Sequence, residues 1–343
     1  MPLLPAARGD LSAAVLDALV GAPPAVGDAD PFAGVAVPSP EDPFGDEDLQ
    51  LALYVLYELH YRGFDGVDDD WEWSPALLGL RARLEAVFEA GLRRLVPPTD
   101  ERPTAEDIDV VLRDIADDDE PSLSKFLGRE ATLEQYREVL VHRSAYQLKE
   151  ADPHSWAMPR LHGRPKAALV EIQADEYGGG RPDRIHAQLF ADAMEALGLD
   201  ATYGAYLERI PASALATVNL MSFFGLHRRL KGAIVGHLAL FEATSSVPNG
   251  RYAAGLRRLG RDDAAATEFF DEHVEADAVH ESLATVDLAG GLIRQDPALA
   301  ADVVFGARCL SVLEGRWAAG ILEAWQAGRS SLLRPLDAEA VAA

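Results

Sequence analysis

Apolar residues recur at intervals of three and four positions along most of the chain, which is the spacing of amphipathic helices. The alternation of apolar and polar positions that marks a strand is nearly absent, and Gly or Pro stands at most junctions between the periodic segments. The pattern therefore predicts an all-α protein. We expect helices over residues 49–60, 76–95, 108–115, 133–148, 166–177, 182–197, 213–241, 264–286 and 297–327.

The two ends of the chain lack this pattern. Residues 21–45 are rich in Pro, Gly and Asp without a clear period, which favours a loosely ordered segment. We therefore expect four parts. They are a flexible N-terminal arm (1–45), N-terminal helices that pack on the core (46–120), a main helical domain (121–333) and a C-terminal tail (334–343).

Composition and charge narrow the possible partners. The chain has 343 residues, of which 48% are hydrophobic, so it can bury a large core. Its net charge of -25 would repel nucleic acids and anionic membrane surfaces, so we expect neither as a partner. The longest apolar run, residues 232–241, is too short to span a bilayer. The first residues do not resemble a secretory signal, and we expect a cytoplasmic protein.

The cysteine content limits metal chemistry. Cys309 is the single cysteine, which excludes an internal disulfide and any cluster of thiolates around zinc or iron–sulfur. It lies in an apolar helical run, where a core thiol is the simplest interpretation. A metal site in this chain must therefore use carboxylates and imidazoles.

One segment near the C-terminal end carries a compact set of such groups. His273, Asp277 and His280 are spaced by four and three residues, which places them within about 60° on one helical face. Three side chains able to bind a metal would therefore converge. The alternative is a solvated polar face with hydrogen-bonded histidines, and the spacing alone does not decide between them.

Two upstream segments add further candidates. Glu176, Asp183 and His186 follow one another, and Asp183 stands three residues before His186 as Asp277 does before His280. The glycines at 178–180 and Pro182 should break the helix between Glu176 and Asp183. Periodicity therefore cannot tell whether these side chains face the same way.

Glu150 is the remaining candidate. It follows His142 and Tyr146 at successive offsets of four, on one face of the helix expected over residues 133–148. By itself it could be an ordinary exposed glutamate at a helix end. Together, the candidate ligands outnumber those that a four-coordinate zinc would use. Carboxylates combined with imidazoles suit iron or manganese. The number of ligands therefore suggests two metal ions bridged by carboxylates.

These residues resemble the haem-oxygenase-like di-iron oxidases, also described as iron-containing redox enzymes. The signature is a helix Glu, a Glu with a His ten residues later, and a His-x-x-x-Asp-x-x-His helix. The matching residues are Glu150, Glu176, His186, His273, Asp277 and His280. Some members add a carboxylate three residues before the second-segment His, and Asp183 occupies that place. The resemblance covers roughly residues 132–325.

The resemblance implies a haem-oxygenase-like helical bundle without haem, extended here by an additional N-terminal helical region. It implies two Fe(II) ions, with manganese as a possible substitute, dioxygen as cosubstrate and an external electron donor. The expected substrate is a small aliphatic amino acid or fatty acid that is desaturated, cyclised, cleaved or hydroxylated. A homodimer is also expected.

Several residues outside the signature remain open. His227, His237 and Glu242 are either hydrogen-bonded structural groups or contacts to substrate or to the metal ligands. An amino acid substrate would need a cationic partner for its carboxylate, and the candidates are Arg160, Arg184 and Arg228.

Three other functions compete with a di-iron oxidase. A ferritin-like iron-binding protein or ferroxidase would use similar pairs of acid and histidine, although with Glu-x-x-His spacing. A noncatalytic helical binding protein would use the same groups only for internal hydrogen bonds. A haem enzyme, with His60 or His142 as axial ligand, is the weakest alternative, because the carboxylates would be poor neighbours for haem.

Overall fold

The computed structural model describes the whole chain except residues 26, 100–101, 118–121 and 337–343, and it leaves the side chains of 276–279 undescribed. No strand occurs among the described residues, so the all-α prediction is confirmed. No helix in this part of the chain combines the length and the hydropathy of a membrane span. The α-helices are α1 (Asp10–Leu19), α2 (Glu47–Glu58), α3 (Pro75–Leu95), α4 (Ile108–Asp117), α5 (Leu123–Arg129), α6 (Leu133–Gln147), α7 (Asp152–Ser155), α8 (Gly163–Glu176), α9 (His186–Ala196), α10 (Ala212–Leu226), α11 (Lys231–Arg258), α12 (Ala264–Ser282), α13 (Gly291–Gln295) and α14 (Ala300–Gln326).

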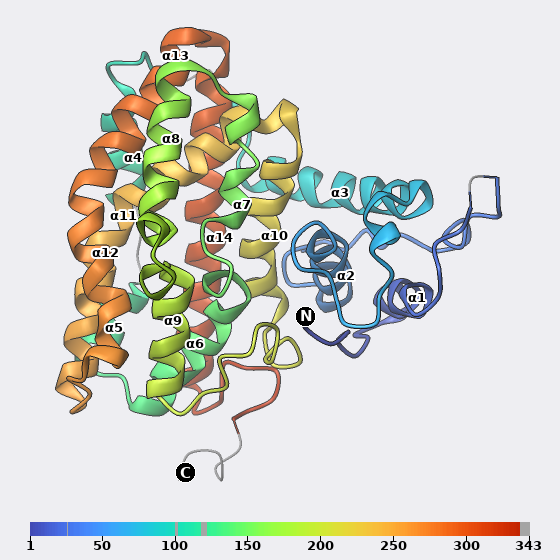
Figure 1. Ribbon diagram of the computed structural model, residues 1–343, viewed down its shortest axis with the longest axis horizontal. Coiled ribbons are helices and arrows are strands. Elements are labelled where there is room, and N and C mark those ends of the chain that lie inside the picture. Colours follow the sequence, from blue (N-terminus) through green and yellow to red (C-terminus); the bar gives the residue numbers. More distant parts are fainter. Residues whose placement is uncertain (26, 100–101, 118–121, 337–343) are drawn as a thin grey trace.

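Helices α4 to α14 form a bundle, and the long helices α11 and α14 pack closely within it (Figure 1). Glycine allows this contact. A Cβ atom on Gly236 would lie 1.9 Å from the carbonyl oxygen of Val303, and one on Gly306 would lie 1.9 Å from that of Ala233. Because any larger residue would push the helices apart, these glycines fix the separation of α11 and α14.

The segment expected as one helix over residues 213–241 is divided. Helix α10 ends at Leu226, and a 3-10 turn over Arg228–Leu230 leads into α11, which continues to Arg258. Pro248 lies inside α11 although proline removes a backbone hydrogen bond there. Packing against α12 and α14 keeps the helix continuous where local propensity predicts a loop.

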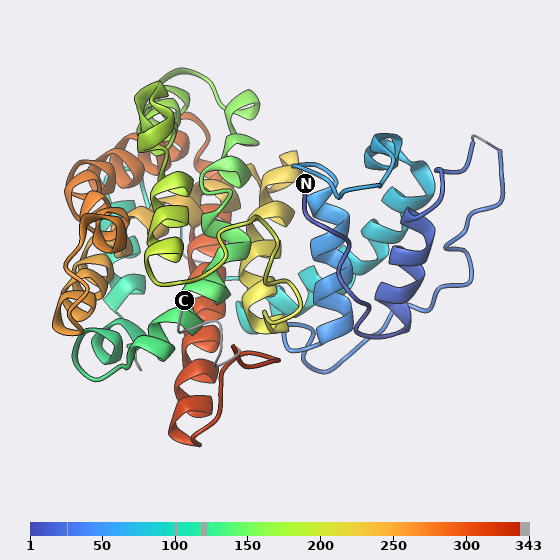
Figure 2. The same ribbon diagram turned by 60° about the horizontal axis from the view of Figure 1, so that its bottom comes forward.

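Helices α1, α2 and α3, with the segments that connect them, form a separate group beside the bundle, here called the N-terminal lobe (Figures 1 and 2). Helix α2 is buried along most of its length and packs on α10, where the Asn219 side-chain amide donates to the backbone oxygen of Gln50 (2.9 Å).

The segment expected to be a flexible arm contains α1 and buries Phe32 and Phe44. Its mobility stays a prediction. Helix α4, expected with the N-terminal helices, packs on α11 and α14.

Candidate metal centre

Two groups of buried carboxylates and imidazoles meet inside the bundle. In each group, one possible ligand atom from every member lies within 4.8 Å of the others. The cavity-side group consists of Glu150, Glu176, His186 and His273, and the helix-side group consists of Glu176, Glu242 and His280. Glu176 belongs to both, so a single carboxylate joins them.

The structure thus brings together five of the seven ligands expected from sequence. The other two are Asp183 and Asp277. Asp183 is exposed, in the 3-10 turn Pro182–Arg184, and belongs to neither group. Asp277 lies in α12 between His273 and His280, but its side chain is outside the described part of the structure.

Glu242 was expected only as a possible contact to substrate or ligands, yet it takes a full place in the helix-side group. Its side chain is buried within α11. In the sequence Glu242 matches no spaced motif and stands just past the expected helix end at residue 241, so it carries little signal as a ligand. Recognising that α11 continues would have turned it into an acid on a buried helix face.

His237 lies next to this centre without belonging to either group. Its Nδ1 is 3.1 Å from Nε2 of His154, and His154 borders the same small space as Glu176 and Glu242. Burial lowers the pKa of His154 to about 4 and also lowers the pKa of His237, so both rings are neutral at pH 7. The two histidines therefore form a buried, uncharged pair, and His154 lies beside the carboxylates of Glu176 and Glu242.

His227 is placed elsewhere. Its Nε2 lies 2.9 Å from Oε2 of Glu85 on α3, and its side chain is partly exposed. The expected alternative of a structural hydrogen-bonded histidine fits this environment.

A glycine turn brings His186 to Glu176. Gly178 and Gly180 have φ values of +65° and +82°, which favour glycine, and a Cβ on Gly178 would lie 2.6 Å from the backbone of Arg184. The chain therefore folds back tightly after α8, and His186 becomes the first residue of α9 rather than a residue inside a helix starting at 182. Its Nδ1 lies 2.9 Å from Oε2 of Glu176.

Hydrogen bonds orient the two histidines of α12. Nδ1 of His273 lies 2.7 Å from the backbone oxygen of Phe269, so it donates there and leaves Nε2 to face Glu150 at 3.7 Å. Nε2 of His280 lies 3.0 Å from Oδ2 of Asp175, which leaves Nδ1 facing Glu242 at 3.4 Å. A metal-binding histidine commonly donates its second N–H in this way. Asp175, next to Glu176, was missed by the sequence analysis.

The charges of the centre are mutually dependent. Burial raises the pKa of Glu176, but His186, His273 and His280 outweigh it and lower the value to about 2. Burial lowers the pKa of His280, but Glu242 and Asp175 outweigh it and raise the value to about 9. At pH 7 His280 is therefore protonated in the metal-free protein and offsets part of the carboxylate charge.

The donor set fits iron. It contains only carboxylate and imidazole groups, which suit iron or manganese, and cations can replace the protons that balance the charge. Oε2 of Glu150 is buried and has no hydrogen-bond partner among the described residues. Burying a carboxylate oxygen without a hydrogen-bond partner costs free energy unless a bound group, such as a cation, interacts with it. The residues that could hold metal here are Glu150, Glu176, His186, His273, Glu242 and His280.

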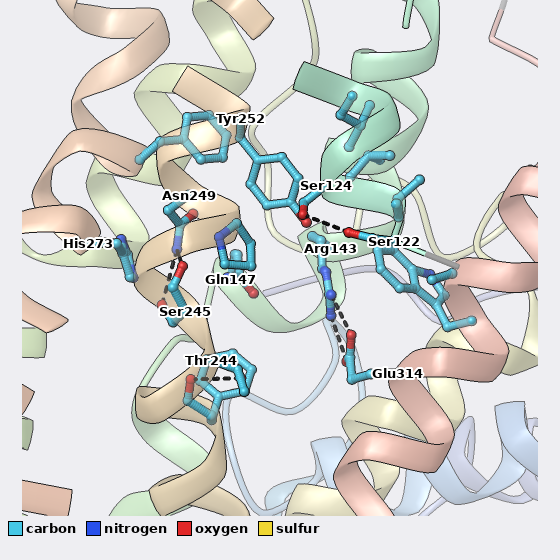
Figure 3. A pocket seen from close by; sticks show the side chains of 18 of the residues that line it. Ser122, Ser124, Arg143, Gln147, Thr244, Ser245, Asn249, Tyr252, His273 and Glu314 are labelled. Carbon is cyan, nitrogen blue, oxygen red and sulfur yellow. Dashed lines mark hydrogen bonds and ion pairs between the residues drawn. The ribbon is translucent and has the colours of Figure 1, made fainter. Parts of the chain in front are cut away.

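A cavity of about 180 Å³ begins at Glu150 and His273 and extends between α5, α6, α11, α12 and α14. Figure 3 shows Gln147 between His273 and an ion pair of Arg143 with Glu314. The two guanidinium nitrogens of Arg143 lie 2.8 and 2.5 Å from the Glu314 oxygens, and the group stacks 3.9 Å above Trp317. The apolar lining includes Leu123, Leu127, Leu140, Phe190, Leu240, Phe241, Phe269 and Leu310.

None of the three arginines expected to bind a substrate carboxylate is placed to do so. Arg160 donates to the backbone oxygen of Leu226 (2.8 Å), Arg184 pairs with Glu268 and Glu272, and Arg228 is exposed. None of the three lines the cavity. Arg143 does line it, and because it precedes Gln147 by four residues in α6, the two side chains share a helical face.

The histidines considered for haem are engaged elsewhere. His142 has Nε2 3.0 Å from the Ser331 hydroxyl, and its Nδ1 accepts from the Trp317 indole (3.3 Å). His60 lies between Glu72 and Arg81. Both rings therefore serve local packing, and the haem alternative gains no support.

A comparison with family profiles matches residues 137–315 to a family described as iron-containing redox enzymes. The match covers just over half of the chain and includes every member of both groups. A search of curated proteins gives no match.

Proposed function

The chain belongs to the iron-containing redox enzyme family, and on this premise we propose that it is a non-haem di-iron oxidase that uses dioxygen. The observation that carries the proposal is the place of Glu176 in both ligand groups. A carboxylate with two oxygens can bridge two cations and offset their repulsion. Two ferrous ions bound there would supply electrons to dioxygen and open positions for it.

The remaining residues of the centre have separate tasks. His273 and His280 each present one ring nitrogen, because the other is held by Phe269 and Asp175 respectively. Helices around the centre exclude water, since all the ligand candidates of both groups are buried. Water exclusion strengthens electrostatic interactions and limits side reactions during oxidation.

The cavity supports a small aliphatic substrate with a charged head. Its apolar walls suit a hydrocarbon body, and Arg143 with Glu314 offers a cation for a carboxylate and an anion for an amine. Oε1 of Gln147 is a buried acceptor without a partner among the described residues. We favour an amino acid over a fatty acid for one reason. If the substrate carboxylate binds Arg143, a fatty acid has no amine to pair with Glu314, whereas an amino acid has one.

Electron balance requires an external donor. If the substrate loses two hydrogen atoms, it provides two of the four electrons needed to convert dioxygen to two waters. The other two electrons, with two protons, must come from an external reductant. For hydroxylation the count is the same, because one oxygen atom enters the substrate and the other leaves as water.

The test is anaerobic loading with ferrous iron, then exposure to oxygen with a panel of amino acids and fatty acids. We expect two irons per chain, a transient visible absorption and oxygen consumption that depends on substrate. His280→Ala should abolish all substrate-dependent consumption. Iron that is oxidised and retained without any substrate dependence would instead indicate a ferroxidase or iron store. Failure to retain iron would favour a noncatalytic binding protein.

A further inference from the structure

Glu150 lies outside the helix on which the sequence placed it. Helix α6 ends at Gln147, and residues 148–151 form a turn. Ala151 has a φ of +72°, a left-handed conformation that is costly for a residue with a Cβ atom. The backbone N–H groups of Lys149 and Glu150 donate to the carbonyl oxygens of Tyr146 and Gln147 (2.8 and 3.3 Å), so the turn follows directly on α6. Because Glu150 lies outside the regular helix, further contacts help to hold its position.

Contacts from two sides hold this turn. On the bundle side, the Gln173 amide on α8 donates to the backbone oxygen of Ala151 (2.9 Å). On the opposite side, the N-terminal lobe supplies Arg62, which donates to the backbone oxygen of Leu148 (2.9 Å). It also supplies Glu58, whose Oε2 accepts from the Lys149 ammonium at 2.8 Å. The two residues immediately before Glu150 are thus both bound by the lobe.

The Glu58–Lys149 pair is almost completely enclosed. The side chains are 0% and 1% exposed, and the Tyr203 hydroxyl donates to the same oxygen of Glu58 (2.6 Å). The Lys149 ammonium lies 4.1 Å from the ring centre of Tyr61 and 5.1 Å from that of Tyr54. A buried ion pair adds little stability compared with apolar residues of similar size, but its geometry is restrictive. Because Lys149 directly precedes Glu150 in the chain, this restricted geometry also limits where Glu150 can lie.

We propose that the N-terminal lobe positions Glu150 in the cavity-side group, through Glu58 on Lys149 and Arg62 on Leu148. The lobe lies before the residues that match the family profile, so the metal centre would depend on a part of the chain outside that match. The inference rests on the proposed function, because it assumes that Glu150 binds iron. Glu58 and Arg62 act here as positioning residues, since neither is a member of the ligand groups.

The test uses two variants of the full chain. Arg62→Gln removes the contact to Leu148 at an exposed position and should fold normally. The double variant Glu58→Gln/Lys149→Met removes both buried charges together, so no unpaired charge remains. In each, we expect the cavity-side iron to bind about 10-fold to 100-fold more weakly, as when a group that supports a ligand is removed. Iron titration at limiting metal should then give one tight ion per chain instead of two.

The matched control is Glu47→Gln. Glu47 also joins the lobe to the bundle, by accepting from the backbone N–H of Ala212 (2.9 Å), but that contact is not at the turn of Glu150. Two tight irons in this variant would support the proposal. Equal loss of iron in the control would overturn it, because docking of the lobe in general would then be responsible. Unchanged iron affinity in Arg62→Gln and in the double variant would also overturn it.

Hydrogen exchange of the metal-free protein separates this inference from the proposed function. The amides of residues 148–152 should exchange at least about 10-fold faster in both turn variants than in the parent chain, and not in Glu47→Gln. If the parent binds no iron pair, the proposed function fails while this measurement still decides whether the lobe holds the turn. Unchanged exchange would overturn the positioning role regardless of metal content.

Discussion

The two ligand groups share Glu176 but are built from different kinds of structure. The helix-side group adds Glu242 from within α11 and His280 from α12, both of which are held by continuous helices. The cavity-side group adds Glu150 from a turn and His186 from the first position of α9. Turns and helix ends can shift without repacking a core, whereas helix interiors cannot. The cavity-side group therefore depends more on contacts outside regular helix than the helix-side group does.

The two groups also differ in how their histidines are oriented. His273 is held by a backbone oxygen four residues earlier in its own helix, so its orientation is set locally. His280 is held by the side chain of Asp175 from α8. Substitution can therefore disturb the support of His280 but cannot remove that of His273 without breaking α12.

The strongest test of the comparison is Glu176→Ala. The shared carboxylate would be lost from both groups, together with the charge that raises the pKa of His186 and balances the other imidazoles. We expect both irons to bind on the order of 100-fold or more weakly, with turnover lost. Iron per chain, measured after anaerobic loading and desalting, should fall from two to near zero.

Asp183→Asn is the matched control for this experiment. Asp183 was a predicted ligand but is exposed and outside both groups, so the variant should keep two irons and full turnover. If Asp183→Asn loses iron, the exposed position of this side chain is not the one used when metal binds. If Glu176→Ala keeps both ions, the two groups do not share a bridging ligand.

Removing one ligand from each group should separate the two sites. His273→Ala should empty the cavity-side site and Glu242→Ala the helix-side site, so each variant should retain about one iron per chain. Turnover should be lost in both, because dioxygen activation needs the pair. Mössbauer spectra of iron-57 samples should show different single-iron signals in the two variants. Identical spectra would mean that both substitutions empty the same site, so the two groups would not be separate sites.

The sequence could predict the ligands that belong to regular spacings. His273 and His280 lie on one helical face, so helix geometry alone predicts that both point toward the centre, although each belongs to a different group. Glu150 and His186 are different, because their positions depend on a left-handed Ala151 and on glycine turns, which periodicity does not describe. Only the resemblance to a known family linked them to the others. Glu242 matches no motif and depends on how α11 packs in three dimensions.

The fold was predictable to a similar extent. Amphipathic spacing located most helices of the bundle, but it ended one helix at residue 241, where Pro248 and polar residues follow. Contacts with α12 and α14 keep α11 helical beyond that point, and such tertiary contacts leave no local signal. Arg143 was missed for a related reason. Its face is readable from sequence, but the cavity that it lines exists only after the helices assemble.

Substitution of Arg143 tests whether the cavity-side group is the one that meets substrate. Arg143→Gln leaves Glu314 without its cation and removes the proposed partner of the substrate carboxylate. We expect KM to rise about 10-fold to 100-fold while both irons remain, because a single charged contact is worth about 1.5–3 kcal/mol. Steady-state oxygen consumption and iron content measure the two effects. An unchanged KM would place the substrate head elsewhere.

The smallest effect should come from Asp175, which touches only the helix-side histidine. Asp175→Asn keeps a hydrogen-bond acceptor for Nε2 of His280 but removes the negative charge that raises the pKa of that ring. We expect the helix-side iron to bind about 10-fold more weakly, with the cavity-side iron unchanged, because supporting groups of this kind affect affinity less than ligands do. Competition with a ferrous chelator resolves the two affinities, and Glu171→Gln, on the same helix but outside both groups, is the control. A loss at the cavity-side site instead would show that Asp175 acts through Glu176, and that the two groups respond as one unit.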